Sequence, residues 1–169
     1  DPTYAVALLK ARRNADALAA ATAARDIAAT LFGERHPAAA EAVAVRAAAL
    51  SALGRRDEAM ADFRLAMPVL IEAATGPYAG ESGARSQRLR FTVEAYLGEL
   101  ARGIAAGPNG VQATGAQTLA AVDQMFRAAE AARSRTLLDA IATAAVRSGL
   151  KDRALADLIR RDQDAARRV

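Results

Sequence analysis

The chain has 169 residues, of which 53% are hydrophobic and only 4% aromatic, and a formal net charge of +4 at pH 7. A chain of this length can bury a core, and filling that core with Ala, Leu, Val and Ile favours helices over sheets. The absence of cysteine excludes a disulfide framework and a thiol nucleophile, and no stretch approaches the roughly 18–20 apolar residues of a membrane span.

The first half of the chain has the apolar period of helices, interrupted by short turns. Pro37 suits a first helical turn, where its missing N–H costs no hydrogen bond. Gly54 suits the left-handed position just past a helix end. We expect helices at residues 3–11, 15–32, 37–53 and 57–74.

Two loops rich in Gly and Pro, residues 75–83 and 107–115, divide the second half. No Gly or Pro stands at the junction of 133 and 134, so the helices on either side can be continuous. The sequence thus predicts an all-α chain of about seven or eight helices. The remaining helices are expected at 84–106, 116–132, 134–148 and 152–168.

A pattern of small and bulky residues recurs at helical spacing. Gly54 precedes Ala59, Phe63 and Ala66, which share one face of a predicted helix. A turn glycine, a small residue and a bulky residue one turn later are typical of a helix-turn-helix repeat unit. We expect the aromatic residues of this pattern, Phe126 included, to lie in the core. The spacing returns 42 residues earlier at Ala17, Ala21 and Ala24, and later at Val122, Phe126 and Ala129.

These residues resemble the tetratricopeptide repeat (TPR) family. Gly54, Ala59, Phe63 and Ala66 match its turn-glycine, small, aromatic and small positions, and the 42-residue step is similar to the longer kinesin-light-chain-like form. The resemblance implies an α-α superhelix of antiparallel helix pairs in a single domain over 1–169. The repeat-like units would be about 3–32, 37–74, 84–132 with loop insertions, and 134–168.

Two positions depart from the family's pattern. Arg46 stands where an apolar residue is usual, and Arg56 stands where an aromatic residue is usual. Both belong to the part of the chain that matches the family best.

A more specific resemblance lies in the C-terminal part of the chain. "FRAAEAARSRTLLDAIA" at 126–142, followed by "LADLIRRDQDAARR" at 155–168, resembles the helical region before the peptidase domain of bacterial CHAT-family proteins, which are caspase-like and carry TPRs. Their His/Cys dyad has no counterpart here. The resemblance implies a non-catalytic regulatory N-terminal region, with any catalytic domain outside this chain, in a bacterial protein that is cytoplasmic or exported.

No group of residues indicates catalysis, a cofactor or a metal. His36 alone cannot form a dyad or a metal site, and we expect it to cap the helix beginning at Pro37. Asp57 and Glu58 fall in a first helical turn, where their charge complements the helix dipole. The arginines are scattered among Asp and Glu, with few aromatic residues, so the sequence predicts no nucleic-acid site.

Binding of protein or peptide is the function that the TPR resemblance implies, on the concave side lined by the first helix of each pair. The partner could be the chain's own downstream domain. A self-associating helical spacer and a free-standing adaptor are the alternatives, with the oligomeric state open. The small residues can also serve helix packing alone. Residues implied to line the groove, and to matter for binding rather than stability, are Glu41, Ala44, Ala48, Ser51, Asp139 and Thr143.

Overall fold

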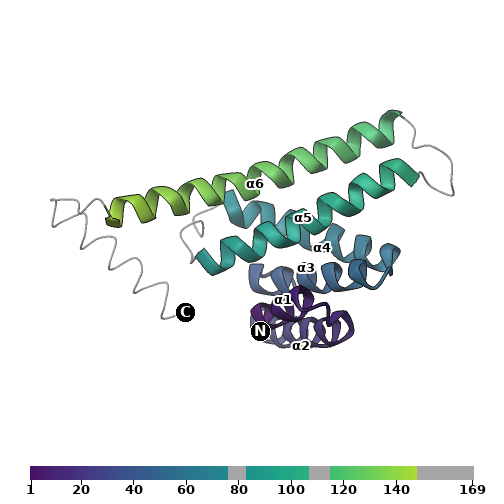
Figure 1. Ribbon diagram of the computed structural model, residues 1–169, viewed down its shortest axis with the longest axis horizontal. Coiled ribbons are helices and arrows are strands. Elements are labelled where there is room, and N and C mark those ends of the chain that lie inside the picture. The colour runs from purple at the N-terminus through teal and green to yellow at the C-terminus, as the bar shows by residue number, and fades with distance from the viewer. Residues whose placement is uncertain (76–82, 107–114, 148–169) are drawn as a thin grey trace.

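The computed structural model describes residues 1–75, 83–106 and 115–147, with the backbone alone given for 75, 83, 106 and 134–147. Within these ranges the chain is all-α, as the sequence predicts, and its helices pack as antiparallel neighbours (Figure 1). The helices are α1 (Pro2–Lys10), α2 (Asn14–Phe32), α3 (Pro37–Ala52), α4 (Arg56–Thr75), α5 (Gly83–Ala106) and α6 (Gly115–Arg147).

The first five predicted helices are confirmed to within one residue at each end. The helices predicted at 116–132 and 134–148 form one continuous helix, α6, because no Gly or Pro interrupts the chain between them. The helix predicted at 152–168 lies outside the described residues, as do most of the two loops at 75–83 and 107–115.

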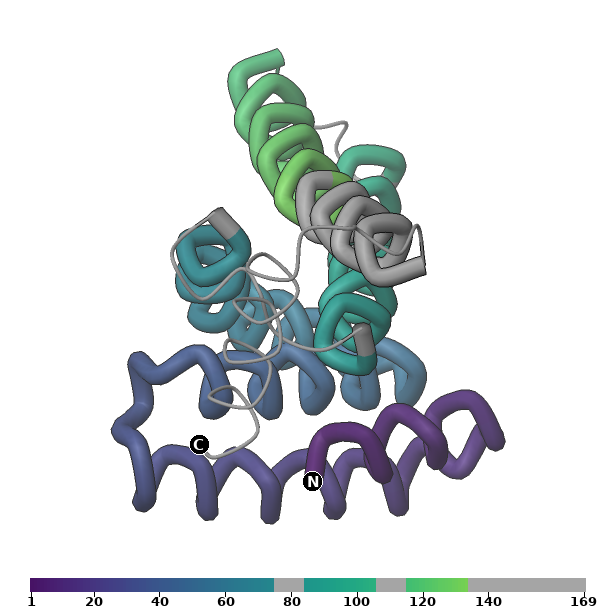
Figure 2. Tube along the Cα trace, turned by 90° about the vertical axis from the view of Figure 1, so that its left-hand side faces the viewer, coloured from purple at the N-terminus to yellow at the C-terminus, as the bar shows by residue number. Residues whose placement is uncertain are grey.

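Helix α3 lies at the centre of the packing. It contacts α1, α2, α4 and α5, and Figure 2 shows it between α2 on one side and α4 and α5 on the other. Helices that are separated by one helix along the chain also contact each other: α1 with α3, α3 with α5, and α4 with α6. Most residues of α3 are buried, and most of them are alanine. Such small side chains let several helices approach one backbone closely.

Arg46, which departs from the apolar pattern, has a buried partner on α4. Its Nε donates to Oδ2 of Asp62 at 2.7 Å, and its Nη2 donates to Oδ1 at 2.6 Å. A guanidinium that faces a carboxylate in this two-bond geometry satisfies both charges at once. The ion pair therefore replaces an apolar contact between α3 and α4.

The main core joins α3, α4, α5 and α6. Phe63 is fully buried, and its ring centroid lies 5.2 Å from that of Tyr96. Phe126, expected in the core, is instead 67% exposed. The reason is the rotation of α6 about its axis, which directs Met125, the residue before Phe126, towards the core together with several alanines. The α6 residues that face the core are Ala121, Met125, Ala128, Ala131 and Ala132.

The two phenylalanines make a matched test of this packing. We expect Phe63→Ala to lower the free energy of unfolding by about 3–5 kcal/mol, because it leaves a cavity. Phe126→Ala should change the free energy of unfolding by less than about 0.5 kcal/mol, because the ring is exposed. Chemical denaturation followed by circular dichroism measures both values, and equal losses would contradict the arrangement of α6.

The α1–α2 and α3–α4 turns have the same backbone hydrogen bonds. The amides of Arg13 and Arg55 each donate to the carbonyl oxygen five residues earlier, at 2.9 Å in both turns. The residues just before them, Arg12 and Gly54, have positive φ angles of 60° and 78°. This is the left-handed helix end in which glycine is usual. Arg12 therefore occupies a conformation that glycine adopts at lower cost.

Substitutions at the two turns should act in opposite directions. Gly54→Ala should lower the free energy of unfolding by about 1 kcal/mol, because an added Cβ meets no atom within 4 Å and only the backbone conformation is strained. Arg12→Gly should raise it by up to about 1 kcal/mol, because relief of the strain at this position exceeds the additional conformational entropy that glycine loses on folding. Gly103→Ala, inside α5, is the control and should stabilise. Thermal denaturation measures all three, and destabilisation by Arg12→Gly would contradict the strain.

Candidate functional site

The α3 residues expected to line a groove lie on the face that meets α5. Glu41 is 7% exposed, Ala44 and Ala48 are buried, and Ser51 is half-buried. These α3 residues contact other helices of the same chain, and their role in binding a partner stays a prediction. The other two expected groove residues, Asp139 and Thr143, lie on α6 with side chains outside the described part.

A partly buried ion pair closes one end of this face. Glu41 on α3 accepts a hydrogen bond from Nε of Arg88 on α5, and its Oε2 lies 3.5 Å from Nε of Arg85. Arg88 also donates through Nη1 to Oγ1 of Thr3 on α1, at 3.1 Å. Glu41 thus joins α3 to α5, and Arg88 extends the connection to α1, which is a structural role that the sequence did not assign to Glu41.

A second buried carboxylate closes the other end. Glu99 on α5 is 3% exposed and accepts hydrogen bonds from Oγ of Ser51, from Nη2 of Arg102 at 2.6 Å and from Nε of Arg56 at 3.2 Å. Burial raises the pKa of Glu99, but the bonds from Ser51, Arg102 and Arg56 outweigh it and hold the pKa below its ordinary value. Arg56, which departs from the family's pattern, therefore has a partner on α5.

This lowered pKa predicts a pH dependence of stability. A carboxylate with a lower pKa in the folded state stabilises the fold above its unfolded pKa of about 4.3, and that contribution is lost as the pH falls through its folded pKa. We expect Glu99→Gln to lower the free energy of unfolding by about 1–2 kcal/mol at pH 7. The difference from the unsubstituted protein should shrink as the pH falls below about 4.

Glu94→Gln provides the control for this experiment. Glu94 pairs with Arg90 at 2.8 Å on the exposed side of α5, where an ion pair contributes less than about 0.5 kcal/mol. Urea denaturation at pH 7, 5 and 3 compares the two substitutions. A loss for Glu99→Gln that does not vary with pH would show that the charge of Glu99 contributes nothing.

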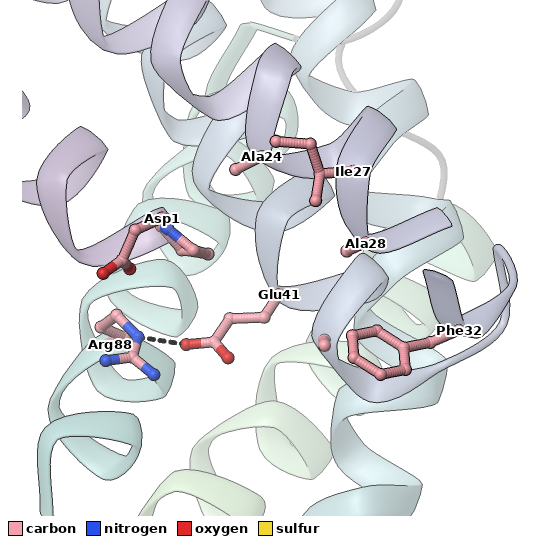
Figure 3. Close-up of a pocket in the computed structure, with 9 residues that line it drawn as sticks. Asp1, Ala24, Ile27, Ala28, Phe32, Glu41 and Arg88 are labelled. Carbon is pink, nitrogen blue, oxygen red and sulfur yellow. Dashed lines mark hydrogen bonds and ion pairs between the residues drawn. The ribbon is translucent and has the colours of Figure 1, made fainter. Parts of the chain in front are cut away.

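An apolar pocket of about 230 Å³ opens beside the Glu41–Arg88 pair (Figure 3). Ile27 and Phe32, near the end of α2, are 60% and 52% exposed and form its rim. The pocket is smaller than the roughly 300–1,000 Å³ of sites for small organic ligands. It is therefore sized for a single apolar side chain. The other lining residues are Asp1, Pro2, Ala24, Ala28 and Ala38.

His36 fixes one side of this rim. Its Nδ1 accepts a hydrogen bond from the Ala38 amide at 3.1 Å, which confirms the predicted cap of α3. Its ring stacks on Phe32 with centroids 4.8 Å apart. The one histidine thus orders the start of α3 and holds an exposed aromatic ring beside the pocket.

The pocket was not predicted from the sequence. Its signal was present in "TLFG" at 30–33, where Leu31 and Phe32 end α2 with no apolar counterpart in the connector. Leu31 is 67% exposed and continues the apolar rim of Ile27 and Phe32. Exposed apolar side chains that adjoin one another are typical of surfaces that bind protein.

Among the described residues, no group of three His, Asp or Glu side chains is placed to hold a metal ion. No helix in the same ranges is long and apolar enough to cross a membrane. Comparison of the chain with protein-family models, with curated proteins and with solved structures finds no match.

Proposed function

We propose that the chain is a TPR-like module, of the kinesin-light-chain-like kind, that binds protein and performs no catalysis itself. The two equivalent turns support this proposal. Arg13 pairs with Asp16 and, 42 residues later, Arg55 pairs with Glu58, both at 2.7 Å. Backbone bonds, positive φ angles and ion pairs thus recur with the spacing that suggested the repeat.

Burial recurs with the same spacing. Ala17 and Ala59 are both fully buried, and so are Ala21 and Phe63. The contacts of α1 with α3 and of α3 with α5 are those that stacked helix pairs would make. A TPR-like stack that extends into a superhelix is therefore the proposed architecture.

The observation that carries the binding function is the apolar pocket with its exposed rim. Ile27, Leu31 and Phe32 expose apolar side chains around a hollow that a single side chain would fill. Apolar anchors that enter a pocket and exclude water dominate the energy of many protein interfaces. The proposed partner is an extended or helical segment that places one aromatic or branched aliphatic side chain in this pocket.

The chain's own downstream domain is the partner that the CHAT resemblance suggests. In that case the module would be the non-catalytic regulatory part of a peptidase-like protein. The motif at 126–142 lies on α6, and the motif at 155–168 lies outside the described residues. The proposed regulatory role is supported by this resemblance alone, whereas the proposed binding function is supported by the geometry of the pocket.

The pocket is tested with peptides selected from a displayed library of linear sequences. We expect the selected peptides to share one aromatic or branched aliphatic residue. Ile27→Glu should weaken their binding at least about tenfold in calorimetric titration, because it places a charge where the anchor must be desolvated. Leu65→Glu is the matched control, since Leu65 is 70% exposed on α4, outside the pocket lining.

Selected peptides that bind Ile27→Glu as tightly as the unsubstituted chain would count against the pocket.

The self-associating spacer, the second candidate function, is favoured by the exposed stripe of Leu119, Val122 and Phe126 on α6. Sedimentation of the same preparations separates the two functions. A dimer that Phe126→Glu dissociates and Ile27→Glu leaves intact would support the spacer.

A further inference from the structure

We propose that the α1–α2 and α3–α4 turns form a basic docking edge that binds an acidic segment of a partner polypeptide. This surface lies apart from the apolar pocket, and its role does not depend on the pocket's. All of its basic side chains are exposed. The basic edge consists of Lys10, Arg12, Arg13, Arg55, Arg56 and Arg102.

The fold brings together arginines that are distant in the sequence. Nδ2 of Asn14, directly after the first turn, donates to the carbonyl oxygen of Ala52, at the end of α3, at 3.3 Å. The two turns are therefore side by side, at the same end of their helices in Figure 2. Arg56 and Arg102, which share Glu99, extend the edge to α5. In the sequence the arginine pairs at 12–13 and 55–56 are far apart. In the fold they lie in adjacent turns, because the turns are related by the 42-residue spacing.

The charges of the edge are unevenly matched. Arg13 and Arg55 pair with carboxylates three residues later, and Arg56 and Arg102 share one buried carboxylate. In the part of the chain that the structure describes, no carboxylate is in ion-pair contact with Lys10 or Arg12. The edge thus keeps positive charge that its own carboxylates do not neutralise.

The backbone of Arg12 indicates that its side chain is used. Arg12 holds a positive φ of 60°, the conformation for which the equivalent turn has Gly54. A non-glycine residue there costs about 1–2 kcal/mol, and such strain is concentrated at functional positions. Packing does not explain the side chain, since Arg12 is exposed. A charged ligand at this turn would explain it.

The carboxylates within the edge favour a polypeptide over a nucleic acid. Asp16, Asp57 and Glu58 lie in the first turns of α2 and α4, among the arginines. A phosphate backbone carries closely spaced charges that these carboxylates would repel. The side chains of an acidic peptide are spaced more widely and can meet the arginines individually, each carboxylate receiving the planar donor fork of a guanidinium.

The test measures binding of a fluorescent peptide, in which Glu alternates with Ser, to the full chain by anisotropy. We expect saturable binding that weakens between about 0.05 and 0.3 M salt. Arg12→Gly should weaken it at least about threefold and Lys10→Glu with Arg12→Glu about tenfold. Arg12→Gly should leave the protein at least as stable, so a loss of binding cannot be a loss of folding. Arg35→Glu, in the connector before α3, is the control for net charge.

Three results would overturn the proposal: no saturable binding of the acidic peptide, an equal loss for Arg35→Glu, or tighter binding of duplex DNA or phosphatidylserine vesicles that depends on Arg12. The last result would assign the edge to a phosphate ligand. None of these three results bears on peptide binding at the pocket, which is measured separately with Ile27→Glu. Failure of the edge and failure of the proposed function are therefore distinguishable.

Discussion

The close packing around α3 is the constraint on which the rest of the structure depends. This helix contacts α1, α2, α4 and α5, and it can do so because most of its buried residues are alanine. Small side chains bring backbones close together but give little apolar surface per residue to bury. Larger residues from the neighbouring helices, such as Phe63 on α4 and Val93 on α5, supply the missing volume.

Two buried carboxylates fix how α5 lies on α3. Glu41 reaches from α3 to Arg88, and Glu99 reaches from α5 to Ser51, so each end of the contact is bonded. Loss of all the partners of either carboxylate would leave a buried charge unpaired, which is strongly unfavourable. Alanine surfaces alone could slide past one another, whereas these bonds specify one register. The same register places Arg88 in the lining of the pocket.

The helix ends were predictable because local residues determine them. Pro37 begins α3, and Gly54 adopts the positive φ of the turn after it. The environment of each helix face was not predictable in the same way. Because α3 is alanine-rich on every side, its sequence does not distinguish a face that lines a groove from one that α5 covers. Glu41 looked like an exposed groove residue, since its half-buried partner Arg88 lies 47 positions later.

Two further features depended on three-dimensional register. Phe126 follows the spacing of Phe63, but α6 is rotated by one residue, so Met125 is directed inward and Phe126 outward. The pocket could not be predicted from the sequence, because its lining residues come from four separate helices. Its rim residue Ile27 reads as ordinary helix in the sequence, whereas Arg88 and Ala38 reach it from α5 and α3. Neither feature is encoded in a short stretch of sequence.

The pocket and the basic edge lie at opposite ends of α2, and this sets the length of a partner that would contact both. The edge adjoins Asn14, where α2 begins, and the pocket rim ends at Phe32, where α2 ends. At 1.5 Å per residue the two sites are roughly 25 Å apart along the helix. An extended polypeptide spans that distance with about eight residues. A single segment with an acidic end and an apolar anchor about eight residues away would therefore satisfy both surfaces at once.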